Sequence, residues 1–103
     1  MKKNEIWRLA LLNAPFAQKS TPLDFLKDLE SGFLYNLIKD EPPAVIAPVF
    51  HCIGYDKSLS VLEKCGMPLK KEVLRSMYLG DMVDSGILSV IANALRRKIE
   101  KKG

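Results

Sequence analysis

The stretch KDEPPAVIAPVF, residues 39–50, decides the fold because it stops one helix and starts another within a few residues. Each proline ring crowds the residue before it, so Glu41 and Pro42 are excluded from the helical conformation, whereas a proline suits the first turn of a new helix. Behind this corner, apolar residues recur at intervals of three and four, at Val45, Ile46, Val49, Phe50 and Ile53. The pattern predicts a helix with a broad apolar face that ends at Gly54.

Upstream of the corner, the sequence predicts two short helices. Thr21, Pro22 and Asp24 have the residue types and spacing of an N-cap, a first helical residue and the partner of a capping box, so a helix is expected to start near Pro22. Apolar residues continue at helical spacing to Lys39. The ESG triplet at residues 30–32 is expected to divide this segment into two helices.

Downstream of Gly54, the same pattern of helix starts and helix ends repeats. Asp56 is expected to cap a helix that Gly66 ends, and Pro68 is expected to open another that Gly80 ends. These assignments predict two helices of about ten residues each, joined by a tight turn.

Amphipathic helices are expected at both ends of the chain. Residues 4–14 carry Trp7, Leu11 and Leu12 and are followed by Pro15, which predicts a helix end. At the other end, Asp84 or Ser85 is expected to start a long helix whose inward stripe is Ile87, Leu88, Ile91, Leu95 and Ile99.

These segments predict an all-α fold. The strict alternation of a β-strand is absent from the sequence, and bundles favour longer helices with fewer breaks. Short helices joined by glycine and proline corners favour a superhelical arrangement. We therefore expect a compact armadillo-like array of about six short helices.

Composition places the chain among ordinary globular domains. Its 103 residues are 48% hydrophobic and 27% charged, which fits one domain. The longest uncharged run, residues 42–55, is shorter than the roughly 20 residues of a membrane-spanning helix. Glu5 and Arg8 interrupt the apolar N-terminus, which argues against a signal peptide. We expect a cytoplasmic protein in which Cys52 and Cys65 are buried thiols.

Motifs for catalysis are missing from the sequence. His51 is the single histidine and has no carboxylate at ligand spacing, so we interpret it as a structural or interface residue. There is no glycine-flanked serine elbow and no glycine-rich phosphate loop. We expect no enzyme activity, no cofactor and no metal, and a function carried by surfaces.

The net charge of +4 and the basic segment RRKIEKK at residues 96–102 raise the alternative of nucleic-acid binding. Cations in the last turn of a helix are favoured by its macrodipole, however, and no aromatic residue interleaves them here. We keep a small basic nucleic-acid-binding helical protein as a less favoured alternative.

From Pro22 onward, the order and spacing of segments resemble the middle domain of the flagellar motor switch protein FliG. That family typically has a proline-led PFEFL segment, a leucine helix, an EHPQ corner, an apolar helix and a long basic final helix. The counterparts here are PLDFLKDLE at 22–30, FLYNLIKDE at 33–41, PPAVIAPVFHCIGYDKSLSVLEKCGMP at 42–68 and LKKEVLRSMYLGDMVDSGILSVIANALRRKI at 69–99. The resemblance implies an N-terminal helical extension over residues 1–19 and a FliG middle-domain-like domain over residues 20–103.

The resemblance also implies a docking site for a protein partner. The family contacts the switch protein FliM through its EHPQ corner and stacks against neighbouring FliG subunits. Glu41 and Pro43 take the acidic and proline positions of that corner, while Pro42 stands in place of its histidine and Ala44 in place of its glutamine. We therefore expect a FliM-like or FliG-like partner, and self-association, at the flagellar basal body. A helical regulatory module like the N-terminal domain of MgtE magnesium channels is a further alternative.

Phe50 and Tyr55 complete the candidate site. An aromatic side chain behind the corner either anchors a partner or fills the core, and the sequence leaves both readings open. The expected partner-binding residues are Glu41, Pro42, Pro43, Ala44, Phe50 and Tyr55.

Overall fold

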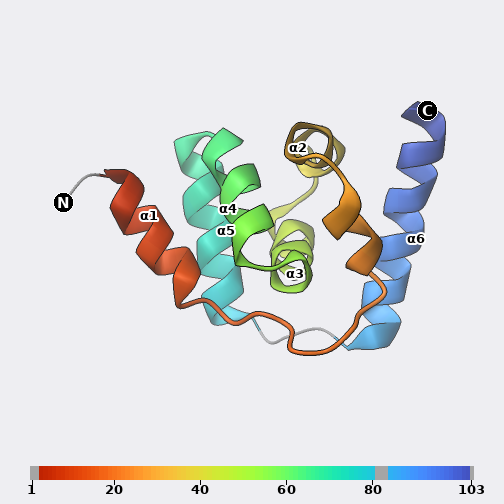
Figure 1. Cartoon of the computed structure of the whole chain (residues 1–103), viewed down its shortest axis with the longest axis horizontal. Helices are drawn as coiled ribbons and strands as arrows, with labels where there is room; N and C mark the ends of the chain where they lie inside the picture. Colours follow the sequence, from red (N-terminus) through yellow and green to blue (C-terminus); the bar gives the residue numbers. More distant parts are fainter. Residues whose placement is uncertain (1–2, 81–83, 103) are drawn as a thin grey trace.

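The computed structural model describes residues 3–80 and 84–102, and all regular elements within them are helical (Figure 1). The predicted all-α, armadillo-like array is confirmed. The elements are α1 (Lys3–Leu12), the 3-10 helix η1 (Asp24–Asp28), α2 (Ser31–Ile38), α3 (Pro43–Ile53), α4 (Tyr55–Lys64), α5 (Met67–Leu79) and α6 (Ser85–Lys102).

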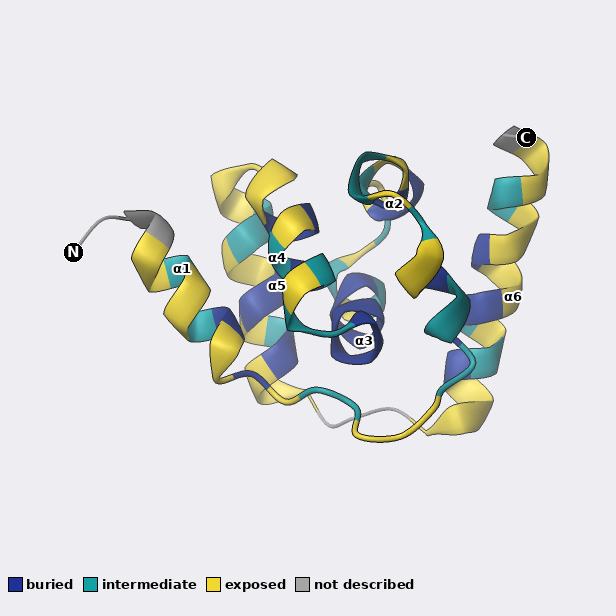
Figure 2. Ribbon diagram, in the orientation of Figure 1, coloured by how far each residue is buried: buried dark blue, intermediate teal, exposed yellow. Residues whose placement is uncertain are grey.

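Helix α3 lies at the centre of the molecule. Every residue from Ile46 to Ile53 is buried, and Figure 2 shows this helix enclosed by the others. Its most extensive contact is with α5, and α4 and η1 also pack against it. A helix that is apolar on all sides is stable in water only when other elements surround it. Helices α1 and α2 pack on α4, and α6 packs on α2.

The proline corner stops α2 and starts α3, as predicted. Helix α2 ends at Ile38, and Pro42 is the N-cap of α3 with φ −63° and ψ 152°, an extended conformation. Pro43 is the first residue of α3. The carbonyl oxygen of Pro42 accepts hydrogen bonds from the backbone N–H groups of Val45 at 2.8 Å and Ile46 at 3.1 Å. The first turn of α3 is thus closed on the corner itself.

Gly54 joins α3 directly to α4. It has φ +86° and ψ 169°, a region that glycine adopts and other residues avoid. The same glycine is the C-cap of α3 and the N-cap of α4, so the prediction that Asp56 caps α4 is wrong. Asp56 lies in the first turn instead, where the helix dipole favours its negative charge.

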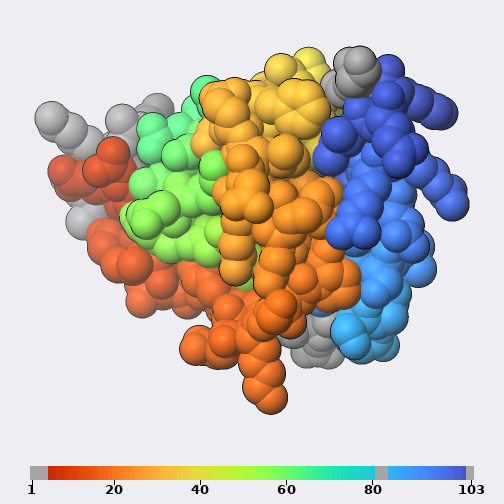
Figure 3. Space-filling model, turned by 45° about the vertical axis from the view of Figure 1, so that its right-hand side comes forward, coloured from red at the N-terminus to blue at the C-terminus, as the bar shows by residue number. Residues whose placement is uncertain are grey.

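The segment between α1 and α2 is less helical than predicted. The helix expected near Pro22 is a turn followed by the five-residue η1. The residues of η1, orange in Figure 3, lie beside α6, and the guanidinium of Arg96 is 4.3 Å from the centre of the Phe25 ring. This cation–π contact ties the segment to the last helix.

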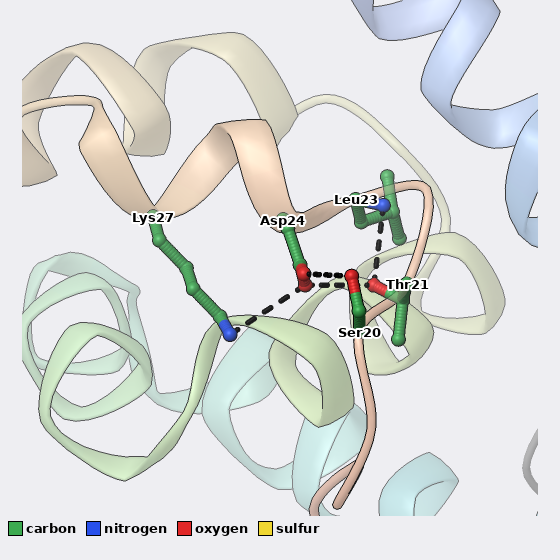
Figure 4. Close-up of polar contacts among 5 residues, drawn as sticks. All are labelled: Ser20, Thr21, Leu23, Asp24 and Lys27. Carbon is green, nitrogen blue, oxygen red and sulfur yellow. Dashed lines mark hydrogen bonds and ion pairs between the residues drawn. The ribbon is translucent and has the colours of Figure 1, made fainter.

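Asp24 organises the start of η1 (Figure 4). Its carboxylate accepts hydrogen bonds from the hydroxyls of Ser20 at 2.8 Å and Thr21 at 3.2 Å, and Lys27 Nζ lies 3.5 Å away. Thr21 Oγ1 in turn accepts from the backbone N–H of Leu23. The hydrogen bond from Ser20 is the main cause that lowers the pKa of Asp24 below its ordinary value.

The boundaries of the last helix agree with the sequence, but its inward stripe is narrower than predicted. Asp84 Oδ1 accepts a hydrogen bond from the Ile87 N–H at 2.9 Å, so Asp84 caps α6 as expected. Leu88 and Leu95 are buried with Ala92. Ile87 is 49% exposed, which corrects its assignment to the inward stripe.

Replacing Gly54 by alanine is expected to lower the free energy of unfolding by about 1–3 kcal/mol, because the backbone there requires positive φ. A Cβ at this position would meet nothing within 4 Å, so conformation alone accounts for the effect. Gly66→Ala is the matched control: it also has open space, but its φ is −69°, and its effect should stay below about 1 kcal/mol. Urea denaturation of both variants measures the difference, and equal effects would contradict this assignment.

Candidate partner-docking site

The corner between α2 and α3 lies on the surface. Pro42 and Ala44 are exposed, whereas Glu41 and Pro43 are half-buried. The four residues are consecutive, and the proline rings fix the φ angles of Pro42 and Pro43. The structure thus brings together four of the six residues predicted for the docking site.

Lys98 of α6 binds the corner through the side chain of Glu41. Its ammonium donates hydrogen bonds to Glu41 Oε2 at 2.8 Å and to the backbone oxygen of Leu37 at the end of α2. The two side chains retain about a third of their exposure, 32% for Lys98 and 30% for Glu41. Lys98 therefore orients the carboxylate of Glu41. The same ammonium also satisfies one of the carbonyl groups at the end of α2, which have no partner within the helix.

Two grooves flank the corner. We call the first the α5 groove; it lies between α3 and α5 and has a volume of about 440 Å³. The second, the α6 groove, lies between the start of α3 and α6 and has a volume of about 210 Å³. Ala44 lines the α5 groove, and Glu41 and Val45 line the α6 groove. A partner that contacts the corner therefore meets a hollow on either side.

The two grooves differ in chemistry. The α5 groove combines small apolar residues with the polar side chains of His51, Glu72, Arg75 and Ser76. The α6 groove is apolar apart from Glu41, and its other lining residues are Val45, Val90, Ile91, Ala94 and Leu95. The second groove is thus suited to an apolar side chain.

His51 has a structural contact, in line with one of the two roles expected for it. The residue is only 4% exposed, and its Nδ1 lies 2.5 Å from the Pro15 carbonyl oxygen. The His51 carbonyl oxygen accepts a hydrogen bond from the Ala17 N–H at 2.7 Å. These contacts fasten the segment after α1 to the last turn of α3.

Phe50 and Tyr55 do not join the corner. Phe50 has no exposed surface, so its assignment as a partner anchor is corrected and it belongs to the core around α3. Tyr55 is half-buried and begins α4, at the far end of the eleven-residue α3, roughly 15 Å along the axis from the corner. Any partner contact at Tyr55 would be separate from the corner.

Chemistry-bearing side chains do not converge among the described residues. No three His, Cys, Asp or Glu side chains there gather into a metal-binding group. Cys52 and Cys65 are buried free thiols, and burial raises the pKa of both. No helix over the described residues combines the length and apolar character needed to cross a membrane.

The comparison with protein families agrees with this geometry. The family model of the FliG middle domain matches residues 31–103, which is most of the chain. The chain belongs to the FliG middle domain family. The match covers α2 to α6 and therefore the corner, Lys98 and both grooves. Comparison with curated proteins and with solved structures gave no significant match.

The FliG middle domain match begins at Ser31, later than the resemblance that was read from Pro22 onward. Residues before Ser31 nevertheless share one core with the family region, because Leu11, Ala14, Leu23 and Leu26 belong to the same buried cluster as α3. The division into an extension over 1–19 and a domain over 20–103 stays a prediction.

Lys98→Met should lower the free energy of unfolding by about 1–2 kcal/mol, because the aliphatic stem is kept while hydrogen bonds to a carboxylate and a carbonyl are lost. Lys101→Met, on the same helix and exposed, is the control and should stay within about 0.5 kcal/mol. A double-mutant cycle with Glu41→Gln should give a coupling of about 0.5–1 kcal/mol. A coupling free energy of zero, measured by denaturation of dilute protein, would show that the pair of Lys98 and Glu41 does not stabilise the corner.

Proposed function

We propose that this FliG middle-domain chain is a non-catalytic interaction module that docks a FliM-like or FliG-like component of the flagellar motor switch at the cytoplasmic face of the basal body. The docking site is the corner formed by Glu41, Pro42, Pro43 and Ala44. The observation that carries the proposal is the exposed, preformed corner between two grooves, within the region that the family match covers.

Preorganisation supports a docking role for the corner. Proline rings fix the φ angles of Pro42 and Pro43, and the ion pair with Lys98 orients Glu41 before any partner arrives. A surface that is already ordered loses little conformational entropy on binding. The corner can therefore contribute affinity even though it is small.

The residues at this corner favour docking through shape complementarity over docking through side-chain hydrogen bonds. Pro42 and Ala44 replace the histidine and glutamine of the family's EHPQ corner, so two polar side chains are absent. Glu41 has one carboxylate oxygen engaged by Lys98. Apolar contact along the α6 groove would supply affinity that the family obtains in part from polar groups at the corner.

The nucleic-acid alternative has less support. Two basic side chains of the last helix are engaged within the fold, Arg96 with the Phe25 ring and Lys98 with Glu41. The regulatory role like that of the MgtE N-terminal domain called for acidic clusters that bind metal. No observation on the described residues favours it.

The proposal is tested by measuring the binding of purified FliM and FliG homologues from the same genome to the immobilised chain. Ala44→Arg places bulk and charge on the exposed edge without touching the core, and should weaken the dissociation constant at least tenfold, or about 1.4 kcal/mol. Asn93→Arg adds the same charge on an exposed position of α6, outside both grooves, and should leave affinity unchanged.

Thermal denaturation of both arginine variants checks that they fold like the parent chain. Failure of the parent chain to bind either homologue would overturn the proposed function. Equal affinity of the Ala44→Arg and parent chains would remove the corner from the docking site.

A further inference from the structure

The α5 groove has a buried polar side chain in its wall. His51 lines the groove and is only 4% exposed. Its Nδ1 faces the carbonyl oxygen of Pro15, which can only accept a hydrogen bond, so in the neutral ring Nδ1 carries the proton. Nε2 then has a free lone pair. The fold therefore fixes the ring of His51 so that it offers a hydrogen-bond acceptor at Nε2.

Nε2 of His51 has no hydrogen-bond partner among the described residues. The contact with Pro15 is the one hydrogen bond that the ring makes there. In the same part of the chain, every side-chain nitrogen or oxygen that is sealed from solvent has a partner. Nε2 is thus reachable from outside, and the α5 groove is the hollow that His51 lines. A ligand in the groove that carries a donor meets an acceptor that the fold leaves free.

The α3 wall of the groove has a second acceptor, the backbone carbonyl of Ala44. Pro48 lies inside α3 and has no N–H, so this carbonyl lacks the donor that a helix ordinarily supplies four residues further on. The residues of α3 that line the groove recur at intervals of three and four and so share one face of the helix: Ala44, Ala47, Pro48 and His51. This face presents two acceptors and a small apolar surface between them.

The opposite wall, formed by α5, carries one charge of each sign. Glu72 and Arg75 line the groove, are exposed, and make no ion pair with any described residue. Exposed charges keep their water, whereas a buried acceptor such as Nε2 of His51 gains most from a new donor. The α3 wall therefore decides which ligand fits, and it selects one that is rich in donors.

We propose that the α5 groove takes an arginine side chain of the protein docked at the corner, an inference that rests on the proposed function. A guanidinium has five N–H donors and no acceptor, arranged in a flat fork that reaches acceptors in different directions. An ammonium has its three donors on a single atom. The groove volume of about 440 Å³ lies within the roughly 300–1,000 Å³ of ordinary ligand sites.

The two walls suit the two parts of an arginine side chain. The aliphatic stem packs on the apolar surface of Ala47 and Pro48, which are buried and line the groove. The guanidinium donates to the acceptors of α3, and the carboxylate of Glu72 balances its charge across the groove. The apolar floor, the acceptors and the carboxylate thus match one side chain.

Arg75 and Ala44 set the direction from which the arginine enters. Arg75 repels a cation that lies close to it, but its donors suit the main-chain carbonyl oxygens of the segment that carries the arginine. Ala44 belongs both to the corner and to the groove, so a segment seated on the corner reaches the groove with one side chain. The α6 groove stays free for the apolar contact assigned to it.

Titration of the isotope-labelled parent chain with N-acetyl-arginine amide, followed by NMR, tests the groove without any partner. The amide shifts should centre on the residues of α3 and α5 that line it, with a dissociation constant on the order of 1 mM, as expected for so small a ligand. N-acetyl-citrulline amide keeps the shape but removes the positive charge, and it should bind at least about fivefold more weakly. Equal binding of the two probes, or no shifts in these helices at about 10 mM, would overturn the proposal.

Two variants locate the guanidinium. Glu72→Gln keeps the size of an exposed side chain and removes its charge, and it should weaken binding of the arginine probe at least about threefold. Glu100→Gln, exposed on α6 and outside the groove, is the matched control and should bind like the parent chain. His51→Asn keeps a donor for Pro15 but removes Nε2, and it should weaken binding about tenfold. Glu72→Gln decides the case if His51→Asn does not fold, and equal binding by Glu72→Gln and the parent chain would overturn the proposal.

Binding of the FliM and FliG homologues separates this inference from the proposed function. Where a homologue binds the parent chain, Glu72→Gln should weaken that binding at least about threefold, and Glu100→Gln should leave it unchanged. A homologue that binds Glu72→Gln as tightly as the parent chain would overturn the inference and leave the corner in place. Failure of both homologues to bind would overturn the proposed function and the source of the arginine, whereas the probe alone decides whether the groove binds a guanidinium.

Discussion

The structure depends on the burial of α3. Eight consecutive residues from Ile46 to Ile53 are removed from solvent, so this helix is enclosed on every side. An enclosed apolar helix leaves its neighbours no freedom to separate without exposing it, which couples α5, α4 and η1 to one centre. The short helices of the array are individually marginal, because isolated helices below about 12–15 residues are unstable in water. Their stability comes from packing, on α3 for α4, α5 and η1, and on α4 or α2 for the other helices.

The corner follows from the same constraint. The buried helix must enter the core from the surface, and its first turn is the place where the chain remains accessible. Two prolines give that entry a fixed direction, and Lys98 links it to α6 through Glu41. The features that position α3 therefore also shape the edge that we propose as a docking site. In this molecule, the stability of the fold and the geometry of the site have a common origin.

The sequence predicted the features that neighbouring residues determine. It failed for features that depend on contacts between residues far apart in the chain. The helix boundaries at Pro43, Gly54 and Gly80, the all-α class and the family were confirmed, whereas the helix expected to start near Pro22 is a turn and a short 3-10 helix. Asp56 was misplaced because Gly54 caps α4 without an intervening residue. Ile87 was assigned from helical spacing, which does not tell how far a helix face is covered by its neighbours, and the sequence left Phe50 open between a partner anchor and a core residue. The contact between Lys98 and Glu41 joins residues far apart in sequence, so no local signal could have found it.

Native-state hydrogen exchange of the parent chain, read amide by amide at low concentration, tests most directly whether α3 organises the fold. The backbone amides of Val49 to Ile53 should be the slowest to exchange and should open only with global unfolding, whereas those of α1 and the ends of α6 should exchange faster through local opening. Amides of α3 that exchange as fast as those of α1 would show that the array holds together without its central helix, and would contradict this account.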